Sequence, residues 1–274
     1  MKNILVTGGA GFIGFQVSRH LAKEGHAVTI CDNLSRGRLD NELQQFLDNH
    51  ENCRFINCDL TDKSQMAKLG SGYDYVYHFA AIIGVIYTNE IPEKVLKTNT
   101  LITINLLDWF IENKCSKILF SSTSEVYAGS AKCYDLPIPT PENVPLTIED
   151  VYNSRYSYAG SKILGELLFI NYARAYDIDM SIVRYHNVYG PRMGFEHVIP
   201  ELSMRIMKRE DPFKLYGPEQ TRAFCYIDDA VRATIKIMET PQAKLEIFNI
   251  GNDAEEIQIR HLASKLLEIA DFSP

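Results

Sequence analysis

The sequence predicts an α/β fold, in which a doubly wound parallel sheet is followed by a smaller, interleaved C-terminal cap. Apolar runs of strand length alternate with helix-like segments through the first half of the chain, which is typical of consecutive βαβ units. A glycine-rich turn at residues 4–14 joins the first apolar run to the first amphipathic segment. After Gly190 the pattern loosens and prolines separate short segments, which predicts the cap.

The elements follow in order along the chain. The expected strands of the first half are Ile4–Thr7, Ala27–Cys31, Cys53–Asn57, Tyr75–Phe79 and Lys117–Ser121. The expected helices of that half are Phe12–Glu24, Asp40–Asn49, Asp62–Leu69 and Pro92–Asn113. After a proline-containing loop at 129–155 we expect a helix at 158–176, a strand at 180–184, a helix at 229–239, a strand at 247–250 and a final helix from 258. We therefore assign 1–188 to a Rossmann-type domain, to which strands near 221–228 and 247–250 return, and 189–274 to a substrate-binding cap.

Composition narrows the classes of protein that fit. The 274 residues carry a formal net charge of −7, which argues against a nucleic-acid surface. No apolar run has membrane-spanning length, and the N-terminus enters a strand without a signal peptide. The 6 cysteines form no CxxC pair, so we expect reduced thiols in a cytoplasmic protein with no metal site.

The glycine-rich turn indicates a dinucleotide site. Gly8, Gly11 and Gly14 leave room for a pyrophosphate to approach the backbone, where the first N–H groups of the helix point at it. Asp32 follows about 20 residues later, at the end of the next strand, where its carboxylate can accept hydrogen bonds from the adenosine ribose and repel a 2′-phosphate. This spacing favours NAD over NADP; the alternative is an ordinary turn and a surface aspartate. Asp59, which ends the third strand, fits either an adenine contact or a turn.

Two polar groups of residues suit proton transfer. Tyr158 and Lys162 are four positions apart, hence on one helix face, and the ammonium is expected to lower the pKa of the phenol. A tyrosine so placed can remove a proton from a sugar hydroxyl as hydride leaves the same carbon. The hydroxyl-rich segment at 121–127 follows the fifth strand, at the sheet edge where ligands bind in such folds. A Ser/Thr-rich turn with a helix-capping acid is the alternative there.

The helix predicted at 92–113 is apolar on most sides and needs cover on both. One side can pack on the sheet. The other can pack on a second subunit, together with the helix that carries Leu164, Leu167 and Leu168, so we predict a homodimer.

From Lys2 to about Leu262 the chain resembles the extended short-chain dehydrogenases/reductases of the NAD-dependent nucleotide-sugar epimerase/dehydratase family. The matching blocks are TGGAGFIG (7–14), DNLS (32–35), CDL (58–60), HFAA (78–81), KTNT (97–100), SSTSEVY (121–127), YAGSK (158–162), RYHNVYGPR (184–192), QTRAFCYIDD (220–229) and NIGN (249–252). The resemblance implies that Thr123, Tyr158 and Lys162 are catalytic, with Ser124 and Glu125 beside them. It implies that the substrate-binding residues are Thr123, Asn187 and Arg222. The cofactor-binding residues that we expect are Gly8, Gly11, Phe12, Ile13, Gly14, Asp32, Asn33, Asp59, Leu60, Ala80, Asn99, Tyr158 and Lys162.

The resemblance implies transient oxidation of a nucleotide sugar at C4, and several reactions begin in that way. Family base rate favours 4-epimerisation. Ser124-Glu125 after the threonine resembles the decarboxylases of UDP-glucuronate, whereas a 4,6-dehydratase carries an Asp-Glu pair there. A net dehydrogenase and a non-catalytic NAD-binding sensor are further alternatives, although sensors of that kind typically lose the Tyr/Lys pair. Relatives usually continue beyond the position of Pro274, so we expect the cap to be truncated.

Overall fold

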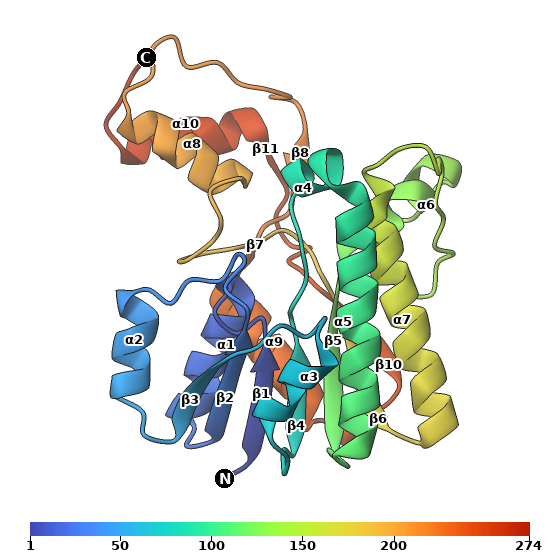
Figure 1. The fold of residues 1–274 in the computed structure, drawn as a ribbon. Coiled ribbons are helices and arrows are strands. Elements are labelled where there is room, and N and C mark those ends of the chain that lie inside the picture. Colours follow the sequence, from blue (N-terminus) through green and yellow to red (C-terminus); the bar gives the residue numbers. More distant parts are fainter.

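A parallel seven-stranded sheet forms the centre of the computed structural model, which describes residues 1–274 (Figure 1). Its strand order is β10-β6-β5-β4-β1-β2-β3, and every neighbouring pair is parallel. The strands are β1 (Asn3–Thr7), β2 (Ala27–Asp32), β3 (Cys53–Asn57), β4 (Tyr75–His78), β5 (Lys117–Thr123), β6 (Asp179–Tyr185) and β10 (Glu246–Ile250). The order reverses beside β1, which creates the crevice where such sheets bind ligands.

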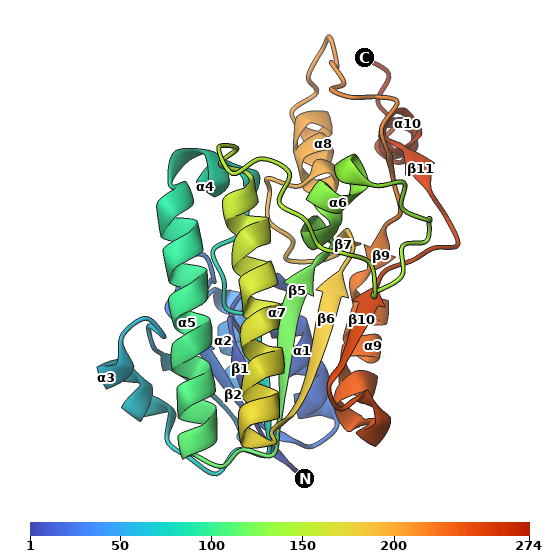
Figure 2. The same cartoon turned by 90° about the vertical axis from the view of Figure 1, so that its right-hand side faces the viewer.

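Helices cover both faces of the sheet. One face packs against α1 (Phe12–Lys23), α2 (Asn41–Asp48) and α9 (Ile227–Glu239), whose apolar residues share one core cluster with β1, β2 and β6. The other face packs against α3 (Lys63–Met66), α5 (Pro92–Glu112) and α7 (Tyr156–Tyr176). Figure 2 shows α5 and α7 side by side on this second face, with α9 behind the strands. The central strands β1, β4 and β5 are buried along most of their length, and each contains a short apolar run because both of its faces are covered.

The cap lies over the carboxyl ends of the strands (Figure 1). It contains α8 (Val198–Met207) and α10 (Ile259–Ile269), which share a small core, and the antiparallel pair of β8 (Thr221–Arg222) and β11 (Ile257–Gln258). The chain between them returns to the sheet domain through β9 (Cys225–Tyr226), which pairs with β7 (Val188–Tyr189).

The prediction of a strand near 221–228 is therefore wrong in detail, since this segment adds nothing to the main sheet. It is split into two strands of two residues each, because α9 begins at Ile227 and the edge beside β6 is taken by β10. Cys225 and Ile227 are nevertheless buried in the core of the sheet domain.

The other predicted elements are confirmed within a few residues. Three helices were not predicted: α4 (Val85–Glu90), α6 (Ala128–Cys133) and α8 (Val198–Met207). The second is fixed by tertiary contact, because a Cβ at Gly129 would lie 1.9 Å from the Thr147 carbonyl oxygen. No helix in the protein combines the length and apolarity needed to cross a bilayer.

Candidate active site

A cavity of about 750 Å³ opens at the carboxyl ends of the central strands, between the sheet domain and the cap. Nearly all residues that the sequence singled out line it. These are Gly8, Gly11, Phe12, Ile13, Gly14, Asp32, Asn33, Asp59, Leu60, Ala80, Thr123, Ser124, Glu125, Tyr158, Lys162 and Asn187. Asn99 and Arg222 are the two exceptions.

The glycine-rich turn forms a tight cradle at one end of the cavity. Gly8 has a φ of +68°, and a Cβ there would lie 2.6 Å from the Ala80 nitrogen. A Cβ at Gly14 would lie 2.4 Å from the Gly8 carbonyl oxygen, so only glycine fits. Helix α1 begins at Phe12 without a side-chain cap, which leaves its first N–H groups free for a ligand. These features fit the pyrophosphate of a dinucleotide.

Asp32 joins the glycine-rich turn to the loop after β2. Its carboxylate accepts hydrogen bonds from the backbone N–H of Leu34 at 2.8 Å and of Ala10 at 3.1 Å. A Cβ at Gly37 would lie 2.7 Å from this carboxylate, so the loop after β2 requires glycine there. Burial raises the pKa of Asp32, and the two N–H donors oppose that shift. Each oxygen keeps a lone pair, and the ribose hydroxyls of NAD can donate to these.

Asp59 serves first as a turn residue. Its Oδ1 accepts from the backbone N–H of Thr61 at 2.9 Å and from the Thr61 hydroxyl at 2.8 Å. The carboxylate still lines the cavity, so both roles predicted from the sequence are compatible with its position.

Thr123, Tyr158 and Lys162 meet where β5 and α7 cross. Thr123 ends β5, and its hydroxyl lies beside the Tyr158 phenol, where it acts to lower the pKa of that phenol. The Lys162 ammonium donates to the Ser121 carbonyl oxygen at 2.7 Å and lies 5.9 Å from the centre of the Tyr158 ring.

The charges of this group differ from those that the sequence predicts. Burial raises the pKa of Tyr158 to about 12, although the Thr123 hydrogen bond and the nearby Arg36 act to lower it. Burial also lowers the pKa of Lys162 to about 7, against the opposing effect of Glu166. Without a ligand, desolvation therefore outweighs the predicted lowering of the phenol's pKa by the lysine. Burial lowers the pKa of His78 to about 3, so its imidazole is neutral and serves as a packing group in the interior.

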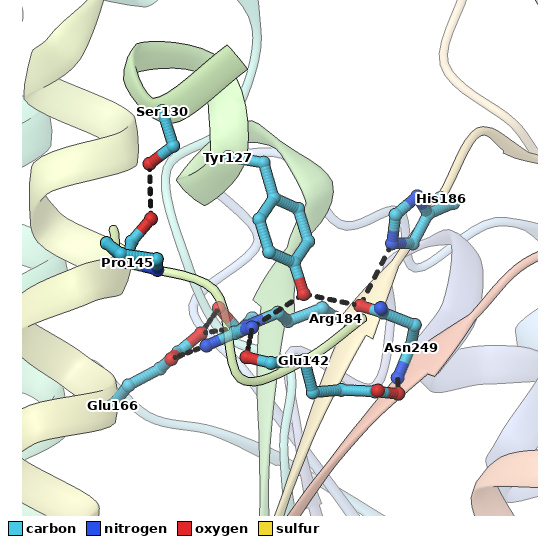
Figure 3. A network of polar contacts seen from close by, with 9 residues as sticks. Tyr127, Ser130, Glu142, Pro145, Glu166, Arg184, His186 and Asn249 are labelled. Carbon is cyan, nitrogen blue, oxygen red and sulfur yellow. Dashed lines mark hydrogen bonds and ion pairs between the residues drawn. The ribbon is translucent and has the colours of Figure 1, made fainter. Parts of the chain in front are cut away.

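A buried polar network supports this arrangement from below (Figure 3). The Arg184 guanidinium donates to both oxygens of Glu166, at 2.9 and 2.6 Å, and Ser122 donates to the same carboxylate at 2.5 Å. Arg184 also donates to the Tyr127 hydroxyl at 2.6 Å and to the Glu142 carbonyl oxygen at 2.9 Å. The network thus joins α7, β5 and β6 to the loop at 129–155.

The same network reaches the edge strand β10. Figure 3 shows the Tyr127 hydroxyl pointing at the side chain of Asn249, to which it donates at 2.9 Å. His186 contacts the same amide oxygen at 3.1 Å, and Asn249 donates to the Thr140 carbonyl oxygen at 2.9 Å. The segment NIGN therefore fixes the long loop in place and does not line the cavity itself.

Sequence reasoning singled out none of the four arginines that line the cavity, Arg36, Arg38, Arg155 and Arg192. Arg36, in the loop after β2, donates to the Ile83 carbonyl oxygen and lies 3.6 Å from Glu196. It therefore connects the loop after β2 with the residues that precede α8. Arg155, directly before α7, lies 3.5 Å from Glu125. The one available signal was position: Arg36 follows the DNLS block, and Arg155 precedes Tyr158 by one helical turn.

The two predicted residues outside the cavity have other contacts. Asn99 is buried; it donates to the Ile82 carbonyl oxygen at 3.0 Å and to Ser161 at 3.1 Å, and accepts from the Ile82 N–H at 2.7 Å. It therefore positions the loop after β4 against α7. Arg222 is exposed on β8 and donates to the Thr221 carbonyl oxygen.

Comparison with known proteins identifies the family. Residues 4–251 match the profile described as the NAD dependent epimerase/dehydratase family. The chain belongs to this family. It is 36% identical over 98% of its length to a UDP-N-acetyl-alpha-D-glucosaminuronate decarboxylase of Bacillus cytotoxicus, of which the match covers 83%. It is 34% identical over 96% of its length to a UDP-glucuronate 4-epimerase of Thermodesulfobacterium geofontis, of which the match covers 79%.

The fold agrees with that assignment. A solved structure of a UDP-glucose 4-epimerase of Thermotoga maritima, with UDP-glucose, superposes with a TM-score of 0.84 at 32% identity, covering 99% of this chain and 84% of that one. The protein is thus an NAD-dependent enzyme with an internal redox cycle, and NAD is the group that the glycine cradle and Asp32 fit.

Proposed function

We propose that this enzyme binds a UDP-linked uronate, oxidises it transiently at C4 and decarboxylates it. One observation carries the proposal: the Glu125–Arg155 pair lines the same cavity as Tyr158, so a carboxylate and a movable cation lie close to the catalytic phenol. The pair is more than a third exposed on both sides, which leaves Arg155 free to turn toward a ligand. The names of the decarboxylase and the epimerase described above both contain a uronate, which supports this class of substrate.

The residues have distinct tasks in this reaction. Tyr158 removes the proton of the 4-hydroxyl, and the Thr123 hydroxyl donates a hydrogen bond to the same oxygen or to the phenolate. NAD, when bound, supplies the hydride acceptor. Arg155 forms a bidentate ion pair with the C6 carboxylate. Without this arginine, the substrate carboxylate would be repelled by the carboxylate of Glu125. Once C4 is a ketone, the β-keto acid loses carbon dioxide, and Ser124 and Glu125 are our candidates for the groups that return a proton to C5. The 4-ketone is then reduced again, so that the overall reaction is redox-neutral.

A second candidate reaction is 4-epimerisation of the same substrate. It begins with the same proton removal by Tyr158 and the same oxidation at C4, and two 4-epimerases named above are similar to this chain over nearly all of its length. A 4,6-dehydratase reaction fits less well, because Ser124 stands in the place of the acid that protonates the leaving hydroxyl. Asn187, which lines the cavity, and Arg222, which is exposed on β8, are our candidates for the substrate diphosphate.

We also propose that the protein forms a homodimer through an exposed apolar surface. Leu96 on α5 and Leu164 and Leu167 on α7 remain 43%, 37% and 52% exposed on two adjacent helices. Pairing of these helices with a second copy removes this apolar surface from water.

The test is turnover of a set of nucleotide sugars. The purified protein is incubated with NAD and, separately, UDP-glucuronate, UDP-N-acetylglucosaminuronate and UDP-glucose, and the products are analysed by mass spectrometry and NMR. We expect loss of the mass of carbon dioxide from a uronate. A product of unchanged mass assigns the enzyme to 4-epimerisation, and failure to turn over any of the sugars rejects the proposal.

Two variants test the roles. Tyr158→Phe is expected to lose at least about 10²-fold in kcat, in line with removal of a general base. Arg155→Ala is expected to raise KM for the uronate while Arg155→Lys restores part of the affinity. Equal effects of Arg155→Ala on NAD affinity and on uronate KM would contradict its role as a carboxylate ligand.

A further inference from the structure

Two cysteines lie side by side beneath the adenosine end of the cavity. Cys31 is the residue before Asp32 on β2, and Cys58 directly follows β3 and precedes Asp59. In the parallel register Cys31 is opposite Ile56, so Cys58 lies two residues further along on the same face of the sheet. The Cys58 N–H donates to the Asp32 carbonyl oxygen at 3.2 Å, which fixes the two strand ends together.

Both thiols line the cavity and also pack in the core between the sheet and the helices of its second face. Each residue is 1% exposed, yet both line the cavity, so a reagent reaches them only through the space that the dinucleotide fills. Both are free thiols. The strand register places both side chains on one face of the sheet, and each thiol shifts the pKa of the other.

The pair is chemically unequal. Hydrogen bonding from Cys31 lowers the pKa of Cys58, and the charge of Lys68 adds to this effect. The same interaction, with burial, raises the pKa of Cys31 well above its usual value. Cys58 is therefore the thiol that becomes a nucleophilic thiolate, and Cys31 is its protonated neighbour.

We propose that Cys31 and Cys58 form an oxidisable dithiol, which a peroxide converts to a disulfide only when NAD is absent, and that the disulfide blocks rebinding of NAD. In the first step the Cys58 thiolate attacks a peroxide oxygen; an S–O bond forms, the O–O bond breaks and hydroxide leaves as water after taking a proton. In the second step the Cys31 sulfur attacks the Cys58 sulfenic acid; the S–S bond forms, the S–O bond breaks and the departing hydroxide takes the Cys31 proton. The balance is two thiols and one hydrogen peroxide to one disulfide and two waters, and a dithiol reductant reverses it.

The disulfide affects NAD through the residues that follow each cysteine. An S–S bond of about 2.05 Å draws the two strand ends together. Asp32 moves with Cys31, and its carboxylate holds the Ala10 N–H inside the glycine turn and the Leu34 N–H of the next loop. Displacement of this one carboxylate therefore disturbs both the ribose site and the pyrophosphate site.

The experiment measures thiols and NAD binding, not turnover, so it does not depend on the proposed reaction. NAD-free and NAD-saturated protein are treated with hydrogen peroxide, the remaining thiols are alkylated, and the peptides are mapped by mass spectrometry. NAD affinity is then measured by calorimetry before and after treatment with a dithiol. We expect a Cys31–Cys58 crosslink in the NAD-free sample alone, a fall in NAD affinity of at least roughly tenfold, and recovery on reduction.

Matched variants separate this pair from the other thiols. Cys133→Ser, which removes an exposed thiol, is expected to keep the full response. Cys58→Ser is expected to abolish it, and Cys31→Ser to stop at a sulfenic acid that dimedone traps. The proposal is overturned if no crosslink forms, if Cys58→Ser oxidises like the unchanged protein, or if the crosslinked protein binds NAD with unaltered affinity.

Discussion

Removal of the charge of Glu166 is expected to destabilise the protein severely. The side chains of Glu166 and Arg184 are 4% and 2% exposed, and the carboxylate accepts two hydrogen bonds from Arg184 and one from Ser122. Glu166→Gln keeps the shape, but it leaves a buried guanidinium without its counter-charge and turns an amide NH₂ toward a donor. Loss of one partner of a buried pair costs about 3–5 kcal/mol. This is a large share of the roughly 5–15 kcal/mol by which a domain is stable.

The assay is urea unfolding followed by intrinsic fluorescence, with thermal melting as a second measurement. At roughly 2–4 °C per kcal/mol for a domain of this size class, the melting temperature is expected to fall by about 6–20 °C. The double variant Glu166→Met/Arg184→Met is expected to recover much of the loss, because it leaves no unpaired charge behind.

A surface pair provides the control. Asp177 and Lys244 lie 3.0 Å apart, but their side chains are 94% and 45% exposed. Asp177→Asn is expected to cost less than about 1 kcal/mol, and asparagine tolerates the positive φ of 49° at this position. A Glu166→Gln variant as stable as Asp177→Asn would refute the argument from the buried network.

Three other predictions use different measurements. Folding lowers the pKa of Lys162 to about 7, so the ligand-free folded protein binds fewer protons than the unfolded chain between pH 7 and 10. Its unfolding free energy is therefore expected to rise by about 1–2 kcal/mol from pH 7 to 9, relative to that of Lys162→Met. Parallel pH profiles of the two proteins would contradict this. Gly14→Ala is expected to weaken NAD binding by at least roughly tenfold in calorimetry, since its Cβ would lie 2.4 Å from the Gly8 carbonyl oxygen; unaltered affinity would contradict the cradle. Leu164→Glu/Leu167→Glu is expected to yield monomers in light scattering where the unchanged protein is a dimer, and a monomeric unchanged protein would end that proposal.

Much of the sheet domain could be predicted from the sequence because its signals are local. A strand buried on both faces is an apolar run, and the turn after β1 needs glycine at Gly8 and Gly14 for reasons that involve only its immediate neighbours and Ala80. Polar residues at the carboxyl end of β5 had to lie at the ligand edge of a parallel sheet, and Thr123 does so.

The rest depends on partners that are distant in sequence. The cap strands are two residues long, and β8 exists only because β11 lies against it. Nothing in the sequence indicates that Arg184 pairs with Glu166. The pKa values of Tyr158 and Lys162 are set mainly by burial, which cannot be read from a motif. Arg155 and Arg36 are arginines of loops, whose role depends on where the loops fold back.

The geometry of the proposed catalytic group results from four successive contacts between β5 and α7. The Phe120 ring occupies the space that a Cβ of Gly165 would need. The carbonyl oxygen of the next strand residue, Ser121, accepts a hydrogen bond from the Lys162 ammonium. The following strand residues, Ser122 and Thr123, contact Glu166 and Tyr158. The strand thus fixes the height and the rotation of the helix through steric contact, a carbonyl oxygen and two hydroxyl groups, and the phenol meets the threonine only if the other three contacts hold.

Gly165→Ala tests this coupling directly. Its Cβ would lie 2.3 Å from the Phe120 ring, so α7 must move outward or Phe120 must change rotamer, at a cost of about 1–3 kcal/mol. Gly160→Ala on the same helix is the matched control, since its Cβ meets only Ile148 at 3.6 Å and alanine favours the helix. We expect Gly165→Ala to lower kcat with little change in NAD affinity, because the glycine turn lies on another element, and Gly160→Ala to keep kcat. If both variants lose stability but keep kcat, the helix position does not set the catalytic distance.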